Sequence, residues 1–97
     1  MARGFVIDVE ECRERLRKKS IGYGRLTDRQ ADILTFILRC WLSGYVPTMR
    51  EIGEEFGIRT PNGVQGNLMA IKRKGYLDHV LGKGYYPNDT ALKLLAP

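Results

Sequence analysis

The chain has few of the residues on which metal centres and covalent catalysis depend. Its 97 residues include two cysteines, Cys12 and Cys40, and one histidine, His79. Zinc and iron–sulfur sites need clustered ligands, and a catalytic nucleophile needs a base beside it, so these three side chains assemble neither. We therefore expect no metal, no cofactor, no small-molecule ligand and no enzyme, with both cysteines packed as reduced thiols.

Long apolar runs are also missing. The unbroken apolar stretches are only a few residues long, whereas a membrane-spanning helix needs about 20. The N-terminus lacks the basic, apolar and small-residue order of a secretion signal. These absences predict no membrane partner and a cytoplasmic location, while 43% hydrophobic and 28% charged residues are typical of a small globular domain.

Positive charge, by contrast, is in excess. Of the net charge of +5, residues 1–25 contribute +3, from seven Lys/Arg against four Asp/Glu, and residues 26–97 contribute +2, from nine against seven. A basic chain suits a polyanionic partner such as nucleic acid, although charge alone identifies no site. The sequence divides into an N-terminal extension over 1–25 and one domain over 26–97.

The extension contains one predicted short helix, within FVIDVEECRERLRKKS. A capping-box pattern marks its start, and Val9, Cys12 and Leu16 share one of its faces. The glycines of SIGYGR end it. Three roles are open for residues 5–19: a homodimerisation helix, a basic arm along a nucleic-acid backbone, or a segment that only packs on the domain.

Residues 26–97 begin with three predicted helices. Thr27 and Thr48 each precede a Gln or Glu by three residues, the capping-box pattern of a helix start. Thr60 starts the third helix, with Pro61 where a missing N–H is harmless. The predicted ends are Gly44, Gly57 and Gly75. The buried stripes expected on the three helices are Leu34, Ile37, Leu38 and Trp41; Ile52 and Phe56; and Val64, Leu68 and Ile71.

The second and third of these helices are close in sequence. About three residues join them, which is typical of a helix-turn-helix. Beyond the third helix, residues 76–81 favour a strand and residues 82–84 a turn. The returning strand is expected at 91–95, with a terminal helical turn over 90–95 as the alternative. The predicted fold class is mainly α with a small β-hairpin (α+β), a winged helix-turn-helix with an extra N-terminal helical segment.

The stretch LTDRQADILTFI…GYVPTMREIGEEFGIRTPNGVQGNLMAIKRKGYL resembles the DNA-binding domain of LexA-type repressors. The shared pattern is roughly L-T-x-R-Q, G-x-x-P-T, E-I, G-x-x-S/T-P-N and K-G, and it covers residues 26 to about 81 without a gap. The resemblance implies sequence-specific binding to double-stranded DNA and a small transcriptional regulator, a repressor of bacterial or phage type. It also implies a cytoplasmic, nucleoid-associated location, but no particular operator.

Three features depart from the family pattern. LexA-type repressors carry a C-terminal self-cleaving peptidase domain with a Ser–Lys dyad that supplies dimerisation, and this chain stops before it. We therefore expect no autoproteolysis from this chain alone. The family's contact helix usually has acidic residues where this one has Gln65 and Gly66. The hairpin region is also about five residues longer.

The predicted helix over 60–74 is the expected recognition helix. In a helix-turn-helix, the second helix places its N-terminal residues in the major groove. Asn and Gln can each make two hydrogen bonds to adenine, and glycines let a backbone approach closely. The predicted base-reading residues are Asn62, Gly63, Gln65, Gly66 and Met69. The predicted DNA-backbone-binding residues are Thr60, Arg29, Arg50, Arg59, Lys72, Arg73, Lys74 and Lys83.

These assignments have structural alternatives. The two amides can support the helix start or be solvated, and cations at a helix end complement its dipole. The stripe of Gly63, Gly66 and Ala70 equally suits close packing of another protein helix. A winged-helix protein–protein interaction adaptor is therefore the alternative function. Tyr85 and Tyr86 either contact DNA or cover the edge of the core.

Overall fold

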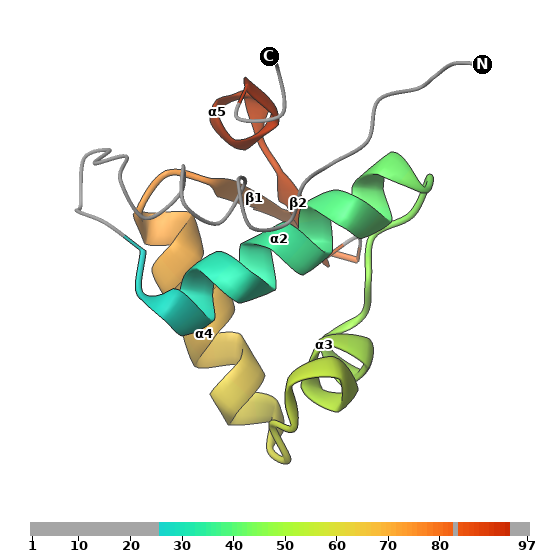
Figure 1. Ribbon diagram of the computed structural model, residues 1–97, viewed down its shortest axis with the longest axis vertical. Coiled ribbons are helices and arrows are strands. Elements are labelled where there is room, and N and C mark those ends of the chain that lie inside the picture. The colour runs from blue at the N-terminus through green and yellow to red at the C-terminus, as the bar shows by residue number, and fades with distance from the viewer. Residues whose placement is uncertain (1–25, 83, 94–97) are drawn as a thin grey trace.

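The computed structural model describes residues 26–82 and 84–93. The elements are α2 (Asp28–Leu42), α3 (Met49–Phe56), α4 (Pro61–Arg73), β1 (Leu77–Val80), β2 (Gly84–Pro87) and α5 (Asp89–Leu92) (Figure 1). The predicted N-terminal helix within residues 5–19, and Lys83, lie outside the described residues. Three longer helices followed by a two-stranded hairpin confirm the predicted α+β class and the winged helix-turn-helix.

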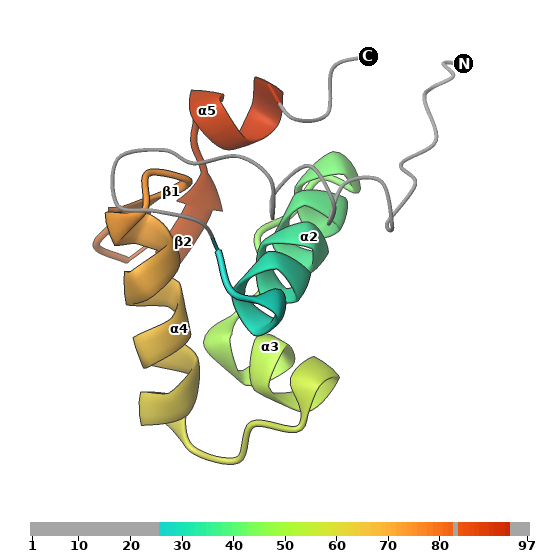
Figure 2. The same ribbon diagram turned by 60° about the vertical axis from the view of Figure 1, so that its left-hand side comes forward.

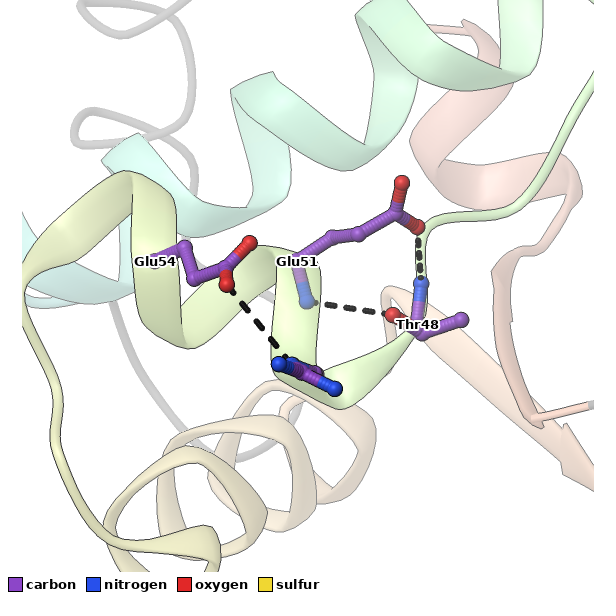
Figure 3. Close-up of polar contacts among 4 residues, drawn as sticks. Thr48, Glu51 and Glu54 are labelled. Carbon is purple, nitrogen blue, oxygen red and sulfur yellow. Dashed lines mark hydrogen bonds and ion pairs between the residues drawn. The ribbon is translucent and has the colours of Figure 1, made fainter.

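The three longer helices begin where their threonines predict. Thr27 and Thr48 form complete capping boxes, and Thr60 caps α4 with Pro61 at the first helical position. In the α3 box, the Glu51 N–H donates to Thr48 Oγ1 at 3.0 Å and the Thr48 N–H donates to Glu51 Oε1 at 2.8 Å (Figure 3). Each cap satisfies backbone donors that lack a partner inside the helix, which is worth about 1 kcal/mol.

The turn between α3 and α4 is short because Gly57 adopts a left-handed conformation. Gly57 is the C-cap of α3, with φ at 68° and ψ at 25°, a region that costs other residues strain. The Ile58 N–H then donates back to the Gly53 carbonyl at 2.9 Å. The chain consequently reverses at once and enters α4 at Pro61, as a helix-turn-helix requires.

The core forms where the three helices and the hairpin meet. Its members include the predicted stripe residues Leu34, Ile37, Leu38, Ile52, Val64, Leu68 and Ile71, with Phe56 packed against them. Trp41 is the exception, because 38% of its surface is exposed. It lies in the last turn of α2, where its ring stacks on that of Tyr86 in β2 at 6.4 Å between centroids. The prediction that Trp41 lies in the core was therefore wrong.

The returning strand of the hairpin lies earlier than predicted. β2 occupies Gly84–Pro87 and pairs antiparallel with β1, from Leu77 opposite Pro87 to Val80 opposite Gly84. The predicted strand over 91–95 is wrong in its described part, because α5 covers Asp89–Leu92. Proline cannot continue a strand ladder, and Asn88 directly after it caps a helix through an Oδ1 acceptor 3.1 Å from the Ala91 N–H.

Asn88 also closes the base of the hairpin, which we call the wing (β1, β2 and the residues between them). Its Nδ2 donates to the Gly75 carbonyl at 2.9 Å, and its backbone N–H donates to the Tyr76 carbonyl at 3.2 Å. One residue thus joins the chain entering the wing to the chain leaving it.

The turn of the helix-turn-helix and α5 lie at opposite ends of the described part. In both views the turn between α3 and α4 is at one end and α5 at the other (Figures 1 and 2). α4 runs along the edge, with α2 and α3 together on one side of it (Figure 2). The wing follows directly from α4, and β1 packs against that helix.

Candidate nucleic-acid interface

One face of α4 is uncovered along the length of the helix. The residues of this open face are Asn62, Gly66, Met69 and Arg73, all of them exposed. The opposite face, Val64, Leu68 and Ile71, is buried in the core. Both sets follow the helical period of about 100° per residue that the sequence predicts. The structure therefore gathers these four residues on one surface, directed away from the core.

The two glycines of this helix have different surroundings. A Cβ on Gly66 would meet nothing within 4 Å. A Cβ on Gly63 would lie 2.8 Å from the Ile58 side chain and 3.1 Å from Thr60 Oγ1. A side chain at Gly63 would therefore collide with the turn before α4 unless Ile58 shifted, whereas the space beside Gly66 is open.

The same observation bears on the small-residue stripe of the alternative adaptor function. Gly63 and Ala70 are half-buried and Gly66 is exposed, and the Ile58 methyl occupies the space beside Gly63. Of these three residues, Gly66 alone is exposed, whereas Gly63 and Ala70 are partly covered by the fold.

Gln65 lies on the flank of α4 that faces the wing. Its Nε2 donates to the Tyr85 hydroxyl at 3.1 Å, and the Gln65 side chain is half-buried. The sequence left Tyr85 undecided between contact with DNA and cover for the core. In the structure Tyr85 covers the edge of the core, because only 8% of its surface is exposed, and its hydroxyl also binds Gln65. No local pattern indicates this pair, because 20 positions separate its members.

The cap of α4 uses the hydroxyl of its N-cap residue only as an acceptor. Thr60 Oγ1 accepts the Gly63 N–H at 3.1 Å, which is the capping interaction. Because a hydroxyl both accepts and donates, the Thr60 O–H hydrogen is not used by the cap. Thr60 is exposed, at a helix start where backbone N–H groups and the helix dipole favour an anion.

The predicted phosphate-binding cations fall into two groups. Arg50, Arg59, Lys72 and Arg73 are exposed on or near α3 and α4. Arg50 makes an exposed ion pair with Glu54 at 3.6 Å, an interaction worth at most about 1 kcal/mol (Figure 3). These four cations are accessible to a polyanion.

Arg29 and Lys74, in contrast, are used within the fold. Arg29 Nη1 donates to the Phe56 carbonyl at 3.2 Å, which ties α2 to the end of α3. Lys74 Nζ donates to Gln30 Oε1 at 2.7 Å, which ties the end of α4 to the capping box of α2. Both cations orient the helix-turn-helix relative to α2. Lys83 lies outside the described residues, between Gly82 and Gly84.

Two features are absent from the described part of the chain. Over residues 26–82 and 84–93, no group of three or more His, Cys, Asp or Glu side chains could hold a metal ion. In the same part of the chain, no helix has the length and apolar character needed to cross a membrane. What the described surface offers is amides, a hydroxyl and cations around an exposed helix.

Comparison with known proteins matches the same part of the chain. The family model described as the LexA DNA-binding domain matches residues 24–84. The LexA repressor of Anaeromyxobacter sp. (strain Fw109-5) is 47% identical over 73 residues, covering 72% of this chain and 32% of the relative. That of Myxococcus xanthus (strain DK1622) is 52% identical over 54 residues, covering 55% and 24%. The chain thus spans about a third or less of the length of these relatives.

Proposed function

The chain belongs to the LexA DNA-binding domain family, and from this premise we propose that it binds a preferred sequence of double-stranded DNA as a transcriptional repressor. In this proposal it is a regulator of bacterial or phage type rather than an enzyme, and it acts at chromosomal DNA in the cytoplasm. The observation that supports it best is the open face of α4, on the second helix of the helix-turn-helix.

The proposed mode of binding places α4 in the major groove. Asn62 in the first turn and Gln65 in the second reach base edges, where an amide can read adenine through two hydrogen bonds. Gly66 lets the helix backbone approach the bases, and Met69 offers an apolar contact to a thymine methyl group. Bound protein then excludes RNA polymerase from the same stretch of duplex.

The proposed backbone contacts come from both sides of α4. The Thr60 O–H and the N–H groups at the helix start hold one phosphate. Arg50, Arg59, Lys72 and Arg73 contact phosphates on either side, and Lys83, which follows β1 in the sequence, contacts the adjacent backbone.

Matched charge-removing substitutions test this surface. Arg73→Gln and Lys93→Gln each remove one exposed positive charge, but Lys93 is the C-cap of α5, which is not part of the helix-turn-helix. Affinity for duplex DNA should fall for Arg73→Gln at low salt, and the slope of log K against log salt should decrease by about 1. Lys93→Gln should bind as the parent does. Equal effects of the two substitutions would contradict the proposed interface.

Base reading is tested by selection of bound sequences from random duplex DNA. Asn62→Ala should relax the preference at one base position while leaving the others intact, at a cost of about 1–3 kcal/mol of discrimination there. If Asn62→Ala instead weakens binding to all sequences uniformly, Asn62 contacts the DNA backbone and reads no base.

A further inference from the structure

The contact between α4 and the wing fixes a side chain beside the proposed base-reading surface. Gln65 is on the flank of α4 next to the open face, and its Nε2 lies 3.1 Å from the Tyr85 hydroxyl. Tyr85 is held in place: it is 8% exposed, and its ring lies 4.4 Å from that of His79 on the paired strand. A fixed hydroxyl thus restrains a side chain that otherwise has several rotatable bonds.

The restraint on Gln65 matters because there is empty space beside its contact with Tyr85. A cavity of about 290 Å³ lies between the wing and the start of α3, and its lining includes Thr48, Gln65, His79 and Tyr85. Gln65 and Tyr85 both line this cavity, so without the hydrogen bond the Gln65 side chain has room to adopt other rotamers. The hydrogen bond to Tyr85 therefore restrains the Gln65 side chain to one position.

The hydrogen bond to Tyr85 also leaves part of the Gln65 amide available to a base. Because Nε2 is the donor to Tyr85, Gln65 retains one N–H and the whole of Oε1. One donor beside one acceptor is the pattern that adenine N7 and N6 require in the major groove.

We propose that Tyr85 is a positioning residue for specificity: its hydroxyl holds the Gln65 side chain beside the open face of α4, where the amide can read adenine. The proposal rests on the proposed DNA-binding function. It adds to that function a residue of the wing which acts through Gln65. Ordering the Gln65 side chain before binding also removes part of the entropy cost of the complex.

The test compares Tyr85→Phe with Tyr86→Phe in the full chain. Both substitutions remove one hydroxyl and keep the ring. The Tyr86 ring stacks on Trp41, whereas the partner of the Gln65 amide is the hydroxyl of Tyr85. Affinities are measured for the selected duplex and for duplexes changed at one base pair. Tyr85→Phe should reduce the preference for adenine at one position about fivefold, as expected for the loss of one hydrogen bond. Tyr86→Phe should leave the preference unchanged.

Two further variants separate positioning from general damage. Gln65→Ala should abolish the preference at the same position, and Tyr85→Phe should then have no additional effect. The proposal is overturned if Tyr85→Phe leaves the base preference intact. It is also overturned if Tyr85→Phe lowers this preference equally in the parent and in Gln65→Ala. Thermal unfolding of each variant shows whether a loss reflects a weakened fold.

A measurement without DNA distinguishes this inference from the proposed function. In the free protein, NMR resonances of the Gln65 side-chain amide should shift and average in Tyr85→Phe and stay as in the parent in Tyr86→Phe. An amide that is unchanged in Tyr85→Phe overturns the positioning role. If the parent shows no preference among duplexes, the proposed function fails, and specificity setting by Tyr85 fails with it, whatever the amide resonances show.

Discussion

Tyr76 is fully buried just after α4, yet within residues 26–82 and 84–93 no group makes a hydrogen bond to its hydroxyl. A buried polar group without a partner gives up its hydrogen bonds to water and gains none in return. The ring packs among the core residues, so the hydrophobic contribution of Tyr76 comes from the ring alone. Burial also raises the pKa of the hydroxyl above its ordinary value of 10.0.

Tyr76→Phe should leave the free energy of unfolding unchanged or raise it by about 1 kcal/mol, because the change removes an unsatisfied hydroxyl and keeps the ring. Its effect should also depend on pH. In the unfolded chain the Tyr76 hydroxyl ionises near pH 10, and in the folded chain it ionises at higher pH. The contribution of this pKa difference to the free energy of unfolding is therefore fully present below pH 10 and is lost as pH rises through the folded-state pKa. Urea unfolding at pH 7 and above pH 10 measures this effect. The free energy of unfolding should fall less between the two pH values in Tyr76→Phe than in the parent. Marked destabilisation at pH 7 would mean that the hydroxyl has a partner.

The two glycines of α4 provide a matched pair of substitutions. Gly66→Ala should stabilise the protein by about 0.5–1 kcal/mol, because alanine is the better helix former and its methyl group enters open space. Gly63→Ala gains the same propensity, but its methyl group collides with Ile58 at 2.8 Å. We therefore expect no gain, or a loss, from Gly63→Ala in chemical denaturation. Equal stabilisation by the two would show that Ile58 moves aside at no cost.

Among the elements, α3 approaches the turn that follows it more closely than its sequence indicates. A Cβ on Gly53 would lie 2.8 Å from the Ile58 carbonyl oxygen and 3.4 Å from Val64 Cγ2. The first of these atoms belongs to the backbone, which cannot rotate out of the way. The angle between α3 and α4 therefore depends on the absence of a side chain at Gly53.

Gly53→Ala should consequently destabilise the protein by about 1–3 kcal/mol, the cost of overpacking, in spite of alanine's higher helix propensity. Gly66→Ala is the control, because it raises the helix propensity without causing a collision. The midpoint of urea unfolding measures the stability of both variants. A Gly53→Ala variant as stable as the parent would mean that the helix-turn-helix tolerates a wider angle.

The sequence predicts those elements whose determinants are local. The starts of α2, α3 and α4 depend on residues within one helical turn of Thr27, Thr48 and Thr60, and the structure confirms all three. The buried stripes follow from the helical period alone. The order of elements, and hence the fold class, could therefore be predicted from these starts and stripes.

What the sequence does not predict depends on distant partners. Trp41 has helical spacing with the core, but its position is set by Tyr86, which is far away in sequence. The roles of Gly63 and Gln65 changed for the same reason, because Ile58 and Tyr85 lie beside them only in the folded chain. The strand over 84–87 was missed although Asn88, a helix N-cap residue, follows its proline directly. That local signal was available in the sequence.

On the scale of the whole molecule, one helix-turn-helix offers few contacts for a specific site, and a symmetric pair doubles them. We propose that residues 5–19 form the dimer contact, a segment outside the described residues. Leu16→Ser should weaken self-association in sedimentation equilibrium, since Leu16 belongs to the predicted apolar face. Arg17→Ser, off that face, should not. The selected DNA should then contain two symmetric half-sites, whereas a single asymmetric site would argue for a monomer.

Because Asn88 closes the base of the wing, the length of the wing can change with little effect on the stability of the domain. Residues inserted between β1 and β2 lie beyond the bonds from Asn88 to Gly75 and Tyr76, so none of the core contacts has to change. The entropy cost of a longer loop closed at a fixed base grows only logarithmically with its length. Insertion and deletion can therefore remodel this extremity in small steps while the core positions keep their spacing.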